Sequence, residues 1–530
     1  MAMDKKYFIH SRAGRLANTD SDGDITSVQD VKNIVAAVKN SAKRHLILHF
    51  HGGLVPKSAG FGIAEKLLPV YLAGGDPVFF IWESGAWETI RNNITELANE
   101  PVFKELVRKV LEYALDRLGA TDGTRSIAPG HADPHKVKET LDEFIRQPGP
   151  DTIPYKRFVP LTSHEQARSA AYAIDTDEIR ADIEGDMDLR AALATLPDIP
   201  VGQRSMLYLA APARPIRDTP FSRLVSENLA KSEGQRGPFS IYKVASLLAG
   251  ILIRVLKRYN RGRDHGLYAT AVEELLRGIK LGGSALNEWA KALEWNRMKQ
   301  DCDDAFAGDP EVNAGTALLA RVRDELNAGK DLARITLIGH STGGVYICAC
   351  IEAAESLLAR EVQFDIVFLA PAVSYERFAS MLSKHAHRIR RFRMFAMSDE
   401  LERNDQVWRA DEALPNGRDW RRFIYPSSLL YLVSGLLESR KSPDGTLADE
   451  ADMPLLGMQR FFSGEAVYNG ADFPEVNEIR RWLRVNANNT VWSYADNAGN
   501  GLNCHCNDHG AFDDEETTLI SLGHIVTEGF

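Results

Sequence analysis

The sequence predicts an α/β protein whose mostly parallel central sheet is flanked by helices and interrupted by a large helical insertion. Short apolar runs rich in branched residues, which are typical of buried strands, alternate with segments whose apolar residues recur at helical spacing. Strands separated by helices pair in parallel, because the chain crosses over the sheet before each new strand begins. This alternation stops near residue 91 and returns near residue 331.

The first segment contributes strands and helices in alternation. Ser27 and Asp30 match a capping box ahead of apolar residues at helical spacing, which predicts a helix over about 28–41. The run HLILHF ends abruptly at a His-Gly-Gly turn, as a buried strand does. We expect strands at 6–10, 45–50 and 78–82, and a second helix at about 60–73.

The rest of the chain divides into a helical interval and a second α/β segment. Residues 91–330 are mostly amphipathic helix, with one weak strand-like piece at 205–210. The later segment predicts strands at 334–338, 364–369, 392–397 and 490–494, a helix to about 358 and a closing helix at 514–525. We therefore expect one discontinuous domain made of 1–90 and 331–530, with 91–330 inserted as a lid or cap.

Composition excludes several classes of protein. A formal net charge of -10 and a pI near 5.8 provide no basic surface for a polyanion, so nucleic acid is a poor partner. Five cysteines in 530 residues are too sparse for a disulfide framework, and the N-terminal residues lack a secretory apolar run, so we expect a cytoplasmic protein. The most apolar stretch, 244–256, is shorter than the roughly 20 residues that cross a bilayer.

The strongest chemical signal is the segment GHSTG at 339–343, placed directly between a predicted strand and a helix. In that context a G-x-S-x-G segment forms a sharp turn that lifts the serine hydroxyl out at the carboxyl end of the sheet. Ser341 is then a nucleophile, and the helix start directs the Thr342 amide at a developing oxyanion. The alternative is a serine in an ordinary glycine-rich turn.

A second signal is the turn at Gly52 and Gly53, which follows an earlier strand of the same sheet. An acyl-transfer enzyme needs another amide donor opposite its nucleophile, and paired glycines let the backbone approach the substrate oxygen. We expect these glycines to contribute to an oxyanion hole. A simple tight turn is the alternative.

A serine hydroxyl needs a base to accept its proton, and the base needs a carboxylate to orient it. His509 is the preferred base because it lies in a polar loop and is followed by a glycine that permits close approach, with His505 and His524 as competitors. The carboxylate is expected after strand 392–397, where Asp399 comes first and Asp405 is the second candidate.

The order nucleophile, acid, histidine, with the GHSTG elbow and the His-Gly-Gly turn, resembles the α/β-hydrolase superfamily of lipases and esterases. The resemblance covers about 1–90 and 331–530 and implies an eight-stranded, mostly parallel sheet and hydrolysis through an acyl-enzyme without a metal or other cofactor. The resemblance implies a catalytic triad of Ser341, Asp399 and His509. It also implies an oxyanion hole formed by Gly52, Gly53 and Thr342. The chain departs from some lipases at Leu54, where they carry another glycine, and in the size of its insertion.

Two features have competing interpretations. An apolar stripe on a helix of the insertion is either a lipid-facing lid or an ordinary packed face, and it consists of Tyr242, Ala245, Leu248, Leu252 and Leu256. The histidine loop also contains Cys504 and Cys506, which with His505 and His509 could hold zinc. Zinc bound there would occupy His509 and exclude the hydrolase chemistry.

These observations predict a serine hydrolase that cleaves a carboxylic ester of a lipid or another small apolar acyl compound. A thioesterase or amidase with the same triad is one alternative, because leaving-group preference depends on pocket shape. A non-catalytic scaffold of the same fold that binds a ligand or partner protein is another. Peripheral membrane contact is compatible with the apolar stripe.

Overall fold

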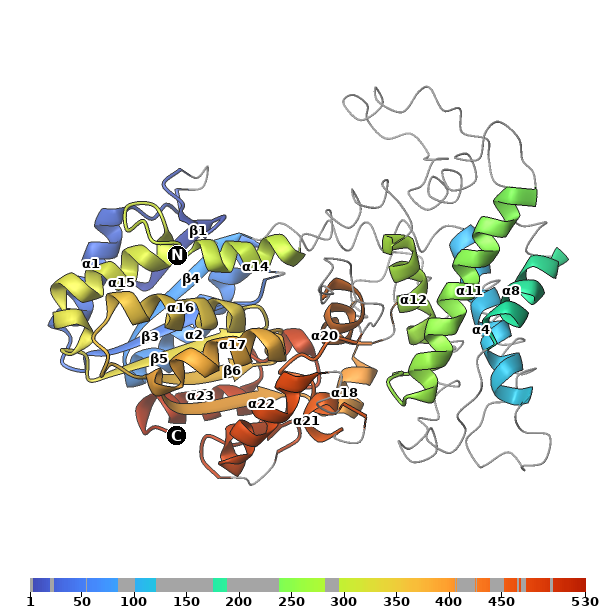
Figure 1. Cartoon of the computed structure of the whole chain (residues 1–530). Helices are drawn as coiled ribbons and strands as arrows, with labels where there is room; N and C mark the ends of the chain where they lie inside the picture. The colour runs from blue at the N-terminus through green and yellow to red at the C-terminus, as the bar shows by residue number, and fades with distance from the viewer. Residues whose placement is uncertain are drawn as a thin grey trace, which may run out of the picture.

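A computed structural model shows an eight-stranded sheet with helices on both faces (Figure 1). The strand order is β2-β1-β4-β3-β5-β6-β7-β8, and only the β1–β2 pair is antiparallel. The described residues are 3–19, 23–53, 55–83, 101–120, 175–187, 238–281, 295–405, 407, 425, 427–438, 452–464, 467–468, 473–495 and 499–530. The predicted α/β class with a mostly parallel sheet is confirmed.

Each strand expected within 1–90 and 331–530 lies in this sheet, and one further short strand, β2, pairs with β1. The strands are β1 (Phe8–Arg12), β2 (Arg15–Leu16), β3 (His45–Phe50), β4 (Asp76–Glu83), β5 (Arg334–His340), β6 (Phe364–Leu369), β7 (Ile389–Ala396) and β8 (Thr490–Trp492). Alternate side chains enter two cores, because successive residues of a strand point to opposite faces. On β3, for example, Leu46 and Leu48 enter the larger core and Ile47 the smaller one.

Two layers of helices cover the sheet. One layer buries the larger core and comprises α1 (Val28–Asn40), α14 (Trp295–Asp304), α15 (Ala314–Glu325), α16 (Gly343–Leu357), α17 (Tyr375–His385) and α22 (Pro474–Arg484). The other buries the smaller core with α2 (Lys57–Gly74) and α23 (Glu516–Thr527). Helix α1 begins with the predicted capping box: the Ser27 hydroxyl accepts the Asp30 amide, and the Asp30 carboxylate accepts the Ser27 amide.

Shorter helices and helical turns lie in the segments that link the strands and the longer helices. They are η1 (Lys5–Tyr7), η3 (Asn327–Gly329), η4 (Ala386–Arg388), α18 (Asp399–Asn404), α20 (Leu429–Leu432), η6 (Val433–Leu437), α21 (Gln459–Ser463), η7 (Ala487–Asn489) and η8 (His509–Ala511). Element η6 is a π-helical turn that continues α20.

Four helices of the range 91–330 pack mainly on one another, to one side of the sheet (Figure 1). They are α4 (Pro101–Ala120), α8 (Thr176–Gly185), α11 (Pro238–Asn260) and α12 (Leu267–Leu281). Helices α14 and α15, which belong to the same range, pack instead with the helices that cover the sheet. The strand-like piece at 205–210 lies outside the described residues.

The apolar stripe on α11 is a packed face of this bundle. Its members Ala245, Leu248, Leu252 and Leu256 are at most 2% exposed, and α11 packs against α4, α8 and α12. The side chain of Tyr242 lies outside the described residues. The interpretation as a packed helix therefore accounts for the stripe, and the lipid-facing alternative does not.

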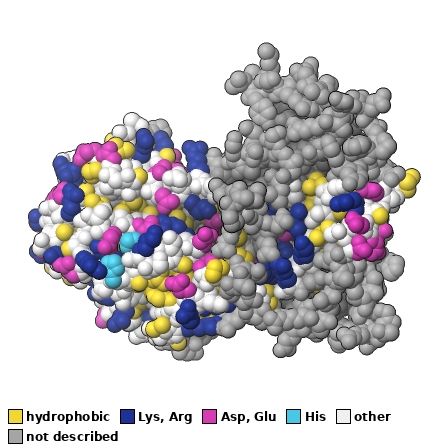
Figure 2. Space-filling view, viewed as in Figure 1, with side chains coloured by type: hydrophobic (Ala, Val, Ile, Leu, Met, Phe, Trp, Pro, Cys, Tyr) yellow, Lys and Arg dark blue, Asp and Glu magenta, His cyan; other side chains and the backbone are white. Residues whose placement is uncertain are grey.

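Within the described part of the chain, none of the helices combines the length and apolarity needed to cross a membrane. On the face shown in Figure 2, acidic and basic side chains are interspersed over the part of the molecule that contains the sheet.

Strand β3 and the turn after it carry buried histidines that resist protonation. Burial lowers the pKa of His45 to about 4, that of His49 to about 3 and that of His51 to about 4, from an ordinary value of 6.5. These side chains take up protons on unfolding at mildly acidic pH, so the folded state is favoured above pH 6.5 and loses that advantage as the pH falls towards their folded pKa values.

We therefore expect the urea midpoint of unfolding to fall clearly between pH 7 and pH 5.5, since each such histidine costs on the order of 1 kcal/mol over that interval. His49→Gln removes one of the three titrating rings. The part of the midpoint change that these three histidines cause should therefore shrink by roughly a third. An unchanged wild-type midpoint across this interval would contradict the assignment of these rings as neutral.

Candidate active site

A sharp reversal between β5 and α16 places Ser341 at the carboxyl edge of the sheet. Its φ of 53° lies in the left-handed region, which costs a residue with a side chain roughly 1–2 kcal/mol. Two backbone hydrogen bonds maintain this conformation: the Ser341 amide donates to the carbonyl of Leu369 at 2.8 Å, and the Ser341 carbonyl accepts the amide of Ala372 at 3.0 Å. The last residue of β6 and the segment just after it therefore hold the turn at Ser341 in place.

Glycines on either side of the elbow permit its close packing. A Cβ atom on Gly343 would lie 2.2 Å from the carbonyl oxygen of Phe50, and one on Gly339 would lie 2.6 Å from the carbonyl oxygen of Gly343. Any side chain at these positions would therefore push α16 away from β3 or β5. The GHSTG spacing is a steric requirement of this turn.

His509 reaches the serine from the loop between β8 and α23. Its Nε2 lies 3.0 Å from the Ser341 hydroxyl oxygen, and each of the two residues is 6% exposed. This distance suits proton transfer between them. The competing histidines lie elsewhere: His505 Nδ1 is 3.4 Å from the Thr517 hydroxyl, and His524 belongs to α23.

The structure does not bring Asp399 to His509. The Asp399 carboxylate accepts the hydroxyl of Tyr431 at 2.6 Å and pairs with Arg403 at 3.2 Å. Asp405, the second candidate, contacts the histidine through the main chain, because its carboxylate accepts the His509 amide at 3.0 Å. The Nδ1 atom of His509 is buried and has no hydrogen-bond partner among the described residues.

A second histidine–aspartate pair, which sequence reasoning missed, lies beside the first histidine. His340 Nδ1 is 3.1 Å from the Asp513 carboxylate, and His340 Nε2 is 2.8 Å from the carbonyl oxygen of His509. Because both partners are acceptors, this geometry fits a ring that donates from both nitrogens and carries a positive charge. Burial, the largest single effect, opposes that charge, but Asp513, the His509 carbonyl and Asp508 together outweigh burial and raise the pKa of His340.

The same surroundings keep His509 neutral. Burial, and after it the neighbouring charge of His340, whose ring centroid is 5.5 Å away, lower the pKa of His509 to about 3. Asp508 and Asp513 act in the opposite direction without reversing the shift. A neutral imidazole is the form that accepts a proton from a hydroxyl.

The expected oxyanion-hole residues gather around Ser341. A Cβ on Gly52 would lie 3.5 Å from Ser341 Cβ, and one on Gly53 would lie 2.7 Å from the Thr342 hydroxyl oxygen, so the turn after β3 faces the elbow. Thr342 precedes the 15-residue helix α16, and its amide donates to no acceptor among the described residues. Leu54 lies outside the described residues.

His51 stabilises the turn at Gly52 and Gly53 through hydrogen bonds. Its Nε2 accepts the backbone amide of Trp82 at 3.1 Å, its Nδ1 lies 2.8 Å from the carbonyl oxygen of Gly52, and its own carbonyl accepts the Trp82 indole N–H at 3.1 Å. These contacts tie the turn after β3 to the end of β4. In the sequence, only the position of His51 directly before two glycines could have indicated that this residue supports the turn.

Comparison of the chain with protein-family models, curated proteins and solved structures finds no match.

Replacing His340 by glutamine removes the positive charge beside His509 and should raise the pKa of His509 above its wild-type value of about 3, while burial continues to lower it. NMR of ¹³C-labelled histidine, with the ring assigned by its loss in His509→Gln, measures this directly. The wild-type ring should remain neutral between pH 8 and pH 5, whereas in His340→Gln its titration should move towards that interval. An identical titration curve in the two proteins would show that His340 carries no charge there.

Proposed function

We propose that this protein is a serine hydrolase of the α/β-hydrolase type that cleaves a carboxylic ester through an acyl-enzyme. The observation that carries the proposal is the 3.0 Å separation of the Ser341 hydroxyl and His509 Nε2 at an elbow where the serine has a positive φ. A hydroxyl beside a neutral imidazole at a strand-to-helix turn is the arrangement that activates serine for nucleophilic attack. The mostly parallel sheet agrees with this fold type.

In the first half of the reaction, the Ser341 oxygen attacks the ester carbonyl while His509 Nε2 takes the hydroxyl proton. The developing oxyanion would be stabilised by the Thr342 amide at the start of α16 and by backbone of the facing turn at Gly52 and Gly53. One such donor typically contributes about 10²–10³ in rate. His509 then gives its proton to the departing alcohol, which leaves the acyl group on Ser341.

In the second half, His509 accepts a proton from a water molecule as that water attacks the acyl-enzyme. The carboxylic acid departs when the proton returns to the Ser341 oxygen. Each half passes through a protonated His509, which burial and His340 disfavour. The negative charges of Asp508 and Asp513 favour the protonated ring and so offset part of this effect.

The substrate class we propose is an acyl ester of a lipid or another apolar acid, with thioesters and amides as the alternatives that the same chemistry permits. We also propose a cytoplasmic location. All five cysteines are free and buried, which agrees with a reducing compartment.

We expect Asp405→Ala to lower kcat/KM for a p-nitrophenyl ester by about 10- to 100-fold, because a charge-assisted hydrogen bond to the His509 amide is worth about 1.5–3 kcal/mol. Asp399→Asn should cost less than about tenfold, since that carboxylate is bound by Tyr431 and Arg403. The opposite ranking would mean that Asp399 leaves Tyr431 during turnover to orient His509, as the sequence predicted.

A fluorophosphonate probe tests the nucleophile. The wild-type chain should be labelled and Ser341→Ala should not, because the probe traps only an activated serine. Ser11→Ala, which removes another buried serine hydroxyl of the sheet, is the matched control and should be labelled like the wild type. A wild type that resists labelling, yet is folded, would favour the non-catalytic scaffold.

A further inference from the structure

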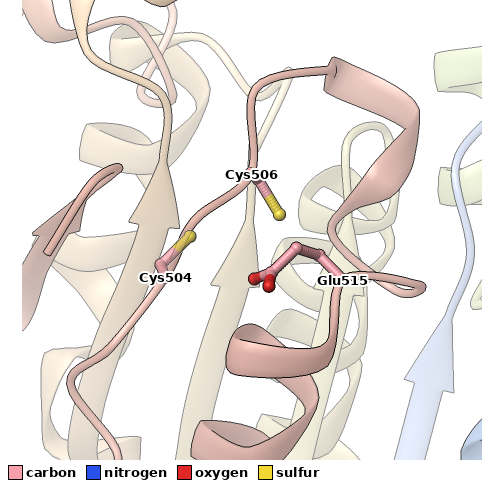
Figure 3. A group of neighbouring side chains, drawn as sticks. All are labelled: Cys504, Cys506 and Glu515. Atoms are coloured by element: carbon pink, nitrogen blue, oxygen red, sulfur yellow. The ribbon is translucent and has the colours of Figure 1, made fainter. Parts of the chain in front are cut away.

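Two thiols of the loop that carries His509 converge with a carboxylate at the start of α23. The sulfur atoms of Cys504 and Cys506 and a carboxylate oxygen of Glu515 all lie within 4.8 Å of one another. Figure 3 shows the three side chains directed into one space between the loop and the first turn of α23. Both cysteines are fully buried and Glu515 is partly buried.

The local backbone explains why the thiols point the same way. Cys504 exchanges backbone hydrogen bonds with Ala495 at 3.3 and 3.2 Å, so the loop is extended there. In an extended chain, side chains two residues apart lie on the same side. Cys506 therefore follows Cys504 on the side that faces α23, where Glu515 is the N-cap residue.

Hydrogen bonds hold Glu515 in a fixed orientation. Its Oε2 accepts the backbone amides of His505 and Thr518 at 3.1 and 2.9 Å and the Thr518 hydroxyl at 2.7 Å. Its Oε1 accepts only the Thr517 amide, at 2.8 Å, within the described contacts. A carboxylate oxygen has two lone pairs, so Oε1 retains the capacity to bind a cation.

Hydroxyl groups surround the sulfur atoms. The Thr518 hydroxyl lies 3.3 Å from the Cys504 sulfur and 3.4 Å from the Cys506 sulfur, and the Ser493 hydroxyl lies 3.3 Å from the Cys504 sulfur. A cation bound between the two sulfur atoms would displace their thiol protons, and the nearby hydroxyl groups could donate hydrogen bonds to the resulting thiolates.

We infer that Cys504, Cys506 and Glu515 form a binding site for a thiophilic divalent cation of the zinc class. Two thiolates favour such an ion over the hard cations, which prefer oxygen ligands. Zinc–sulfur bonds of about 2.3 Å in tetrahedral geometry separate two sulfurs by roughly 3.8 Å, which the observed cluster accommodates. The hydrogen bonds that orient Glu515 are the kind of support that metal ligands require.

This site differs from the zinc site that the sequence offered as an alternative. That site used His509 and would have excluded the hydrolase chemistry, whereas in the structure His509 faces Ser341 and Glu515 joins the thiols instead. A cation bound here leaves Ser341 and His509 together. The cation would link Cys506, three residues before His509, to Glu515 at the start of α23.

Cadmium is the probe for this site, because cadmium–thiolate bonds absorb in the ultraviolet. The full chain, reduced and stripped of metal with a chelator, should bind one equivalent of Cd²⁺ with a charge-transfer band. Cys504→Ala combined with Cys506→Ala should lose the band and the equivalent. Glu515→Gln should keep the band but bind about 10-fold more weakly or worse, since the thiolates remain and one ligand is lost.

The chain offers a matched control in Cys348 and Cys350, which have the same spacing. They lie on α16, where residues two apart point about 200° apart around the axis, so they cannot chelate one ion. Cys348→Ala combined with Cys350→Ala should therefore keep the band. Ser341→Ala should bind Cd²⁺ like the wild type, so failure of the proposed hydrolase activity leaves this result intact.

The inference is overturned if the reduced wild type binds no Cd²⁺, or if the band survives in the Cys504 and Cys506 double variant. Should that variant fail to fold, ¹¹³Cd NMR of the wild type identifies the ligands directly. A chemical shift in the range of two-sulfur sites supports the assignment, and a shift in the all-oxygen range overturns it.

Discussion

The left-handed conformation of Ser341 is the constraint from which the rest of the site follows. It reverses the chain between β5 and α16 so tightly that the backbone at Gly343 lies against the carbonyl of Phe50 at the end of β3. That single contact sets how near the turn after β3 comes to the start of α16. The hydroxyl, the amide of Thr342 and the glycine turn are thus placed relative to one another by backbone packing, which side-chain motion cannot relax.

His509 is positioned chiefly through its main chain. Its amide donates to Asp405, its carbonyl accepts from His340, and its Nε2 faces the Ser341 hydroxyl. A serine hydrolase usually orients the imidazole through a carboxylate on Nδ1, which also selects the tautomer. Here the described residues leave Nδ1 without a partner, so the loop carries the orienting role and the charge of His340 favours the neutral ring.

Features encoded locally could be predicted from the sequence. The strands follow from short apolar runs, the first helix from its capping box, and the elbow from five consecutive residues that must form one turn. The approach of His509 to Ser341 could be predicted because a serine hydrolase would need its base on a late loop, and a polar loop follows the last strand. In each case the information lies within about ten residues of the feature.

Features that depend on distant partners could not be predicted. Asp399 and Asp405 lie at opposite ends of one short helix, and the side to which each carboxylate turns depends on Tyr431 and on His509, far along the chain. The pairing of His340 with Asp513 joins residues 173 positions apart. No local pattern distinguishes such a pair from a solvated histidine and a solvated acid.

The loop from Cys504 to Glu515 connects the proposed cation site with the site at Ser341. Its ends are fixed by the bridge of Cys504 to Ala495 and by the Glu515 cap of α23, and His509 lies between them. A displacement of about 1 Å in a reacting group can cost roughly 100-fold in rate, so the reach of His509 depends on how rigidly those ends are held. In the proposed reaction the base would be oriented by backbone, so stiffness of this loop would take the place that a carboxylate on Nδ1 holds in serine hydrolases.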